Sequence, residues 1–309
     1  MSRLRVRAAL GALATTLACA GCGFGPGAGS SAVSLRVTEN FGSTPIKTVD
    51  PAKVTGSETD MQLLEHHFSV KTRYGGGFVE SIDGHSGTSH RYDWFYYVNG
   101  IQAKKGAAAT NVDKGDHIWF DLHDWAATES IPDVVGSFPE PFLSGTGGQR
   151  YPSTIECGSH VKAACSVVSR EFRHLHIPLS PAGLGYGSGT DSLSINVGTW
   201  KQLSPQVAAE LVKYGPGASG VYAHFSSNGR RIMLDNEAGK VVRTLGPDSG
   251  LIAAVGDAQA AVPTWLVAGT DPAGVMAAAR AVTPQALADH FALAVHGSTR
   301  YPVPLTGSS

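Results

Sequence analysis

The run from Tyr92 to Gly100 (YDWFYYVNG) constrains the fold of this 309-residue chain more than any other stretch. Its aromatic side chains favour a strand, and its closing Asn99-Gly100 pair is the strongest short signal for a hairpin turn. Side chains alternate across a strand. Trp94, Tyr96 and Val98 are therefore expected on one face, and Phe95 and Tyr97 on the other. A further turn, Val112–Asp116 (VDKGD), and a Trp-containing strand follow it, so the sequence predicts antiparallel β-structure here.

The first 22 residues resemble a bacterial lipoprotein signal peptide. Three arginines precede an apolar run, Ala8 to Ala20, that is too short to span a bilayer, and Cys19-Ala20-Gly21-Cys22 closes the segment. The resemblance implies that Cys22 becomes the first mature residue and carries acyl chains such as palmitate. Those chains would hold the protein in the lipid bilayer at the outer, extracytoplasmic face of the cell membrane. Secretory cleavage without lipid is the alternative.

Composition limits the other partners. Loss of three arginines with the signal changes the formal net charge from −1 to about −4, which argues against nucleic acid or anionic lipid as the main partner. Gly and Pro clusters divide the chain. The predicted parts are a signal at 1–21, a tether at 22–31, a β-rich unit at 32–130, a linker at 131–150, a second unit at 151–303 and a tail at 304–309.

The second unit is predicted to be α+β with a mixed sheet. Helices are expected at 161–172, from the Ser204-Pro205 start to Leu211, after Asp271-Pro272 and after Pro284. Strands are expected at 192–199, 221–225, 231–234, 241–245, 251–255, 264–268 and 291–295, and His174 and His176 are placed on one further strand. In the first unit, Ser57 and Asp60 are expected to cap a short helix.

Cys157 and Cys165 are the cysteines outside the signal segment, and in an oxidising compartment they are expected to form a disulfide. Both on one helix would lie about 12 Å apart along its axis, too far to bridge. The bond therefore requires Cys157 just outside a helix that carries Cys165. A two-cysteine metal site lacks further ligands nearby.

The motif from Trp94 to Gly100, followed by Val112–Asp116 and a Trp-containing strand, resembles the transcobalamin C-terminal-like family over about residues 32–125. The resemblance implies a small β-grasp-like domain. In the vitamin carriers of that family the domain closes over a corrinoid held mainly by a helical domain. The second unit of this chain is too short and too strand-rich to be that helical domain. The fold is thus implied more strongly than the ligand.

Trp94, Tyr96, Tyr97, Asn99 and Trp119 are the candidate ligand-binding residues. Flat rings and a phenol suit a planar small molecule or a glycan, while the alternative is that these rings form the core. Histidines are numerous, but none of their groups has a complete metal-ligand spacing, so no metal is expected. These groups are His85, His90 and Asp93; His117, His123 and Asp124; and His174 and His176.

Neither a nucleophile elbow, nor a zincin helix, nor a P-loop occurs in the sequence. We therefore expect a non-catalytic surface protein that binds a small ligand, which the resemblance suggests to be corrinoid-like or otherwise flat, and that needs no cofactor. Two alternatives stay open. One is a secreted envelope hydrolase with a Ser-His-Asp arrangement that only geometry reveals, and the other is a structural or adhesive surface module.

Overall fold

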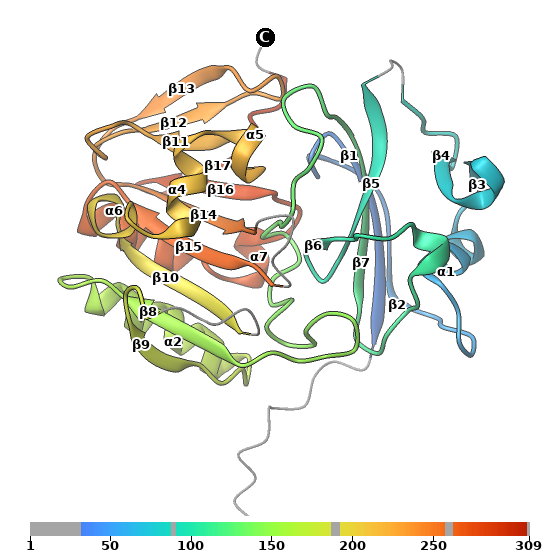
Figure 1. Ribbon diagram of the computed structural model, residues 1–309, viewed down its shortest axis with the longest axis horizontal. Coiled ribbons are helices and arrows are strands. Elements are labelled where there is room, and N and C mark those ends of the chain that lie inside the picture. The colour runs from blue at the N-terminus through green and yellow to red at the C-terminus, as the bar shows by residue number, and fades with distance from the viewer. Residues whose placement is uncertain (1–31, 88–90, 187–191, 257–261, 308–309) are drawn as a thin grey trace, which may run out of the picture.

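A computed structural model describes residues 32–87, 91–186, 192–256 and 262–307. The signal segment, Cys22 and the tether lie outside these residues, as does His90. The fold is α+β and rich in strands, as predicted. Figure 1 shows a first unit, coloured blue to green, beside a second unit coloured yellow-green to red. Within the described ranges, no helix is long and apolar enough to cross a membrane.

The first unit is built on a five-stranded sheet of order β2-β1-β7-β5-β6, in which the β1–β7 pair is parallel and the others are antiparallel. Its strands are β1 (Val33–Glu39), β2 (Thr44–Ala52), β5 (Tyr92–Val98), β6 (Ile101–Gln102) and β7 (His117–Asp124). Helix α1 (Asp60–His67) and the hairpin of β3 (Val70–Arg73) and β4 (Phe78–Ile82) lie on the side of this sheet that faces away from the second unit (Figure 1).

The predicted hairpin turn is present between β5 and β6. Asn99 and Gly100 both have positive φ, 55° and 79°, as a two-residue turn that matches the strand twist requires. A Cβ at position 100 would lie 2.9 Å from the carbonyl oxygen of Val134, so a side chain there meets backbone as well as strain.

The cap of α1 corrects one prediction. Thr59, in an extended conformation, caps the helix in place of Ser57. The Thr59 hydroxyl accepts from the Gln62 backbone N–H at 3.3 Å, and Gln62 Oε1 accepts from the Thr59 N–H at 2.9 Å. A capping box requires, at the third helical position, a side chain that accepts from the backbone N–H of the cap residue, and Gln62 is that residue. Asp60 is consequently the first helical residue.

The second unit is built on a seven-stranded mixed sheet of order β17-β16-β14-β15-β10-β8-β9. Strands β9, β8, β10 and β15 run parallel to one another, and β14, β16 and β17 add antiparallel pairs. Their bounds are β8 (Ser153–Cys157), β9 (Ser180–Gly183), β10 (Leu193–Thr199), β14 (Ser249–Val255), β15 (Thr264–Gly269), β16 (Ala292–His296) and β17 (Thr299–Val303).

Each face of this sheet has its own cover. Apolar side chains of α2 (Lys162–His174), α6 (Pro272–Ala281) and α7 (Pro284–Leu287) form one core cluster with the sheet. On the other face, the cover comprises α3 (Trp200–Leu203), α4 (Val207–Lys213), α5 (Pro216–Ser219) and the three-stranded sheet of β11 (Ala223–Phe225), β12 (Ile232–Asp235) and β13 (Val241–Leu245).

In this unit, one predicted helix start and one predicted strand are wrong, while the helices predicted at 161–172, after Asp271-Pro272 and after Pro284 are confirmed as α2, α6 and α7. Ser204 ends α3, whose own start is a capping box of Thr199 and Gln202, and α4 begins later, at Val207. His174 is the last residue of α2 and His176 has a left-handed φ of 58°, so the two histidines are not on a strand. Asp271 caps α6 as predicted and accepts from the Gly274 N–H at 2.9 Å.

The connection at residues 131–150 contains no helix or strand, yet most of it is buried. Phe138 and Phe142 pack against Phe172 and Trp265 of the second unit, with ring centroids 5.0–5.7 Å apart. The chain therefore passes from one unit to the next inside the packed body of the protein.

The two units share a hydrophobic core. Phe291 of the second unit lies among Phe41, Tyr97 and Trp119 of the first, with ring centroids at 5.3, 5.5 and 5.3 Å. Aromatic pairs at such separations add to the gain from apolar burial. The sheet of the first unit is thus covered on both faces, by α1 on one and by the second unit on the other.

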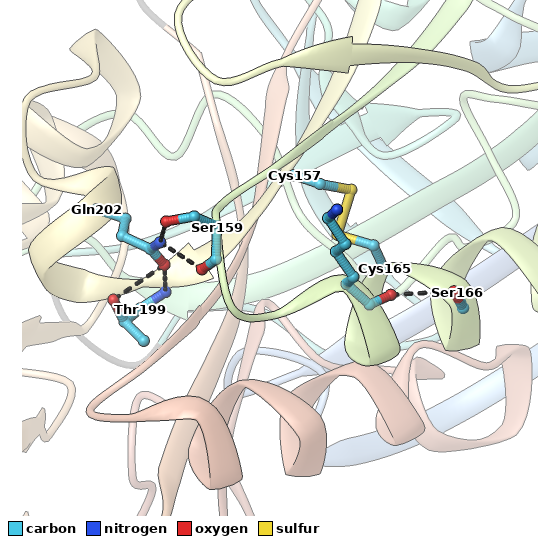
Figure 2. Close-up of a disulfide and its surroundings, with 7 residues drawn as sticks. Cys157, Ser159, Cys165, Ser166, Thr199 and Gln202 are labelled. Atoms are coloured by element: carbon cyan, nitrogen blue, oxygen red, sulfur yellow. Dashed lines mark hydrogen bonds between the residues drawn. A yellow bond between two sulfur atoms is a disulfide. The ribbon is translucent and has the colours of Figure 1, made fainter.

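Cys157, at the end of β8, is bonded to Cys165 within α2, as predicted (Figure 2). Beside it, the Gln202 side chain donates to the carbonyl oxygen and the hydroxyl of Ser159 at 2.6 and 2.9 Å. The bond and this contact fix the loop that connects β8 to α2.

Changing both cysteines, Cys157→Ser with Cys165→Ser, is expected to lower the free energy of unfolding by about 2–3 kcal/mol, because the bond closes a short loop whose freedom the unfolded chain then regains. Denaturant unfolding of both forms measures the difference. The reducing agent dithiothreitol should bring the unaltered protein to the stability of the double variant and leave the variant unchanged; equal stability of the oxidised protein and the variant would contradict the prediction.

Candidate ligand pocket beside the Asn99-Gly100 hairpin

The structure buries most of the predicted ligand-binding rings. Tyr97 and Trp119 are fully buried in the core shared by the two units, and Trp94 belongs to the core under α1. Tyr96 packs against that same core, so the predicted alternation of Tyr96 and Tyr97 across the sheet is confirmed. Because the rings of Tyr97 and Trp119 fill the contact between the units, they present no free face to a flat ligand.

A cavity of about 340 Å³ lies next to the hairpin, at the lower end of the size range of small-molecule sites. Four segments line it: the hairpin itself, the stretch that follows β6, the turn before β7, and the end of the connection. The lining residues are Val98, Ile101, Gln102, Ala103, Lys104, Lys105, Thr110, Asn111, Asp113, Asp116, Thr146 and Gly147. We call this cavity the hairpin pocket.

The Asn99 side chain joins the hairpin to the turn before β7 and to the end of the connection. Its side-chain amide donates to Asp116 Oδ1 at 2.9 Å and to the carbonyl oxygen of Gly145 at 2.8 Å, and its Oδ1 accepts from the His117 N–H at 2.7 Å. Asn99 is buried, so these bonds are shielded from water. The asparagine that makes the turn therefore also fixes the wall of the pocket.

Tyr96 supports another wall through its hydroxyl, which donates to the carbonyl oxygen of Lys105 at 2.5 Å and lies 2.9 Å from Thr110 Oγ1. Burial raises the pKa of Tyr96 to about 12. The phenol therefore keeps its proton and acts as a structural donor. Tyr96 and Asn99 thus contact lining residues without lining the pocket themselves.

Asp116 is the buried carboxyl of the pocket. Its Oδ1 accepts from Asn99, and its Oδ2 accepts from the Asp113 N–H at 2.7 Å. Burial raises its pKa to about 6, against which these hydrogen bonds act. Asp116 is therefore largely ionised at neutral pH and gains a proton in mild acid.

Asp60 is a second buried carboxyl, which the sequence pattern identified only as a helix cap. Its backbone N–H donates to the carbonyl oxygen of Thr110 at 2.9 Å, next to the pocket wall. Neither side-chain oxygen has a hydrogen-bond partner among the described residues. Burial first, and then the charges of Asp116 and Asp113, raise its pKa to about 8, so Asp60 is mostly protonated at neutral pH.

None of the histidines in the described residues lines this pocket. His117 Nδ1 lies 2.9 Å from Ser137 Oγ, and partial burial of the residue lowers its pKa to about 3. His296 Nδ1 lies 2.9 Å from the fully buried Ser249 Oγ. Neither pair lines the hairpin pocket. Over the described parts of the chain, no three His, Cys, Asp or Glu side chains are placed to hold a metal ion.

Comparison with known proteins identifies one domain family. Residues 57–124 match the model of a domain of unknown function, DUF4430. This stretch lies within the region of the predicted resemblance and contains Asp60, Asn99 and Asp116. None of the curated proteins matches the chain.

Solved structures that are similar to part of the chain include the following two. One is a proposed metal binding protein from Ruminococcus gnavus ATCC 29149, with 18% identity and a TM-score of 0.26, covering 31% of this chain and 98% of that one. The other is haptocorrin in complex with Cbi, with 17% identity and a TM-score of 0.24, covering 31% of this chain and 26% of that one. Similarity of this extent transfers neither metal nor Cbi to the present chain.

Asp60→Asn is expected to raise the free energy of unfolding at pH 7.5 by on the order of 2 kcal/mol. Below about pH 4 the carboxyl is protonated in both states and contributes nothing. Between that pH and its folded pKa of about 8 it is ionised in the unfolded chain only, so stability falls as pH rises. The asparagine removes this dependence, which urea unfolding at pH 5 and 7.5 measures.

Glu129→Gln, an amide substitution at an exposed position, is the matched control and should unfold like the unaltered protein at both pH values. An Asp60→Asn variant that is equally or less stable at pH 7.5 would mean that the carboxyl has a stabilising partner in solution.

Proposed function

We propose that this protein is a non-catalytic binding protein that holds a small polar ligand in the hairpin pocket. The observation that carries the proposal is the lining: Asp113 and Asp116 border the same cavity as Lys104 and Lys105, beside an apolar surface from Val98. A cavity with convergent polar groups on an apolar base is the usual form of a small-molecule site.

Charges of both signs around one small cavity fit a zwitterionic ligand, such as a free amino acid or a short peptide. An ammonium group would pair with Asp113 or Asp116, since a carboxylate has acceptor sites beyond the hydrogen bonds that Asp116 already makes. A carboxylate group of the ligand would pair with Lys105. The volume of about 340 Å³ and the filled contact between the units both favour a ligand smaller than a corrinoid.

We also propose that the mature protein is attached to the outer face of the cell membrane through acyl chains on Cys22. Support comes from the pattern of the signal segment and from the Cys157–Cys165 bond, which is typical of an oxidising compartment outside the cytoplasm. The pocket would then face the extracytoplasmic solution.

A thermal-shift screen with free amino acids, dipeptides, hexoses and cobinamide tests the pocket. A zwitterion at one hundred times its dissociation constant should stabilise the protein by about 2.7 kcal/mol. Asp113→Asn and Lys105→Gln should each abolish most of the shift, because each removes one charge and leaves the Asn99–Asp116 hydrogen bond in place.

Lys53→Gln, an exposed lysine outside the pocket lining, is the matched control and should keep the full shift. A stabilising ligand whose effect survives both pocket substitutions would contradict the site. A shift with cobinamide and with none of the zwitterions would contradict the ligand class.

Cys22→Ala should abolish metabolic labelling by an alkyne analogue of palmitate and leave the protein out of the washed membrane fraction or unprocessed, because the thioether can no longer form. Cys19→Leu, which alters the other cysteine of the segment and introduces the commoner residue at that place, should remain labelled and attached. A Cys22→Ala protein that is still labelled, or that is processed and yet stays attached as firmly as the unaltered one, would contradict the anchor.

A further inference from the structure

A second cavity, of about 590 Å³, lies on the second unit between α6 and the β16–β17 hairpin, apart from the hairpin pocket. Its lining combines small and apolar residues of the helix with the hairpin turn and two arginines. The lining residues are Asp248, Ala273, Met276, Ala277, Arg280, Ala281, Val295, Gly297, Ser298 and Arg300. We call it the arginine cavity.

The helix supplies one wall through a single face. Ala273, Met276, Ala277 and Arg280 are spaced three, four and seven residues apart, so they line up along one side of α6. The methyl groups of Ala273 and Ala277 are too small to fill the space beside them. This face of α6 therefore leaves space for a ligand beside its alanines, and the guanidinium of Arg280 lies at the end of that space.

The hairpin supplies the other wall. Arg300 lies directly opposite Val295 in the antiparallel pair of β16 and β17, so both side chains are on the same face of the sheet. Val295 belongs to the core cluster that α6 covers. The Arg300 side chain thus emerges on the helix side of the sheet, where Arg280 borders the same cavity.

Charge is unevenly distributed along this cavity. Arg280, in the last turn of α6, interacts favourably with the helix dipole, but Arg300 is on a strand and has no such role. Within the described residues, neither arginine makes a salt bridge. The acidic residue that borders the cavity is Asp248, whose backbone N–H donates to Oδ2 of the helix cap Asp271 at 2.8 Å. This places its backbone near the start of the helix, about 13 Å along the axis from Arg280.

We propose that the arginine cavity binds an anionic group, carboxylate or phosphate, that is joined to a short apolar chain. The two guanidiniums bind the anion, for which their planar donor geometry is well suited. The chain lies against Met276, Ala277 and Val295.

Methyl NMR of the full mature protein tests the site, with Met276 and the valine methyl groups labelled. Hexanoate and hexyl phosphate are expected to shift the Met276 and Val295 signals saturably. Acetate carries only the anionic group and hexan-1-ol only the apolar chain, so each should bind at least about tenfold more weakly than hexanoate. Arg280→Gln and Arg300→Gln should each weaken hexanoate binding about tenfold, the effect of losing one charge-assisted hydrogen-bonding partner.

Arg230→Gln, an exposed arginine in the β11–β12 turn, is the matched control and should bind hexanoate like the unaltered protein. Ala277→Leu, which fills the cavity and keeps both charges, should also weaken binding, and the unfolding midpoint of each variant establishes that it is folded. Unchanged Met276 signals with hexanoate, or equal binding by the Arg280, Arg300 and Arg230 variants, would overturn the proposal.

Discussion

The arrangement of the two units depends on one buried carboxylate, that of Asp121 on β7. It accepts from the Thr38 hydroxyl and from the N–H groups of Phe41 and Gly42 at 3.0 and 2.8 Å, and it lies 2.8 Å from His123 Nδ1. These bonds hold Phe41 at a φ of 57°, which is unfavourable for a residue with a side chain and persists only where its surroundings enforce it. As a result of this backbone conformation, the loop directs the Phe41 ring into the shared core, where it packs against Phe291.

That shared core occupies a face of the aromatic sheet that was expected to take a ligand. With Tyr97 and Trp119 packed against the second unit and α1 covering the opposite face, neither face of the aromatic sheet is free. The hairpin pocket forms instead at the end of the sheet, where the turn at Asn99 meets the turn at Asp116. Of the rings that suggest stacking when read along the chain, Tyr96 fixes a wall of the pocket through its hydroxyl, and the others are part of the core. The function we propose therefore rests on the polar groups of the pocket rather than on a flat aromatic surface.

Features determined within a few residues could be predicted from the sequence. The Asn99-Gly100 turn, the alternation of Tyr96 and Tyr97, and the Asp271 cap all follow from local preferences of the chain. Local reasoning fails where several residues compete. Thr59 caps α1 because the Gln62 side chain accepts from the Thr59 backbone N–H in return. Ser204 ends a helix because the capping box of Thr199 and Gln202 has already started one. The choice among neighbouring hydroxyl residues depends on packing that no short window contains.

The candidate site shows the same limit more sharply. Asn99 stood out as a turn residue and Asp116 as part of a second turn, but their hydrogen bond joins positions 17 residues apart and closes only when β5 and β7 pair. Asp60 was missed as a buried acid because an aspartate at the start of a helix is ordinarily solvated. In the folded protein its backbone N–H donates to the carbonyl oxygen of Thr110, 50 positions along the chain, and its side chain is fully buried. Within the described residues the Asp60 carboxyl has no hydrogen-bond partner, and a buried acid in this state is more typical of binding sites than of parts that only support a fold.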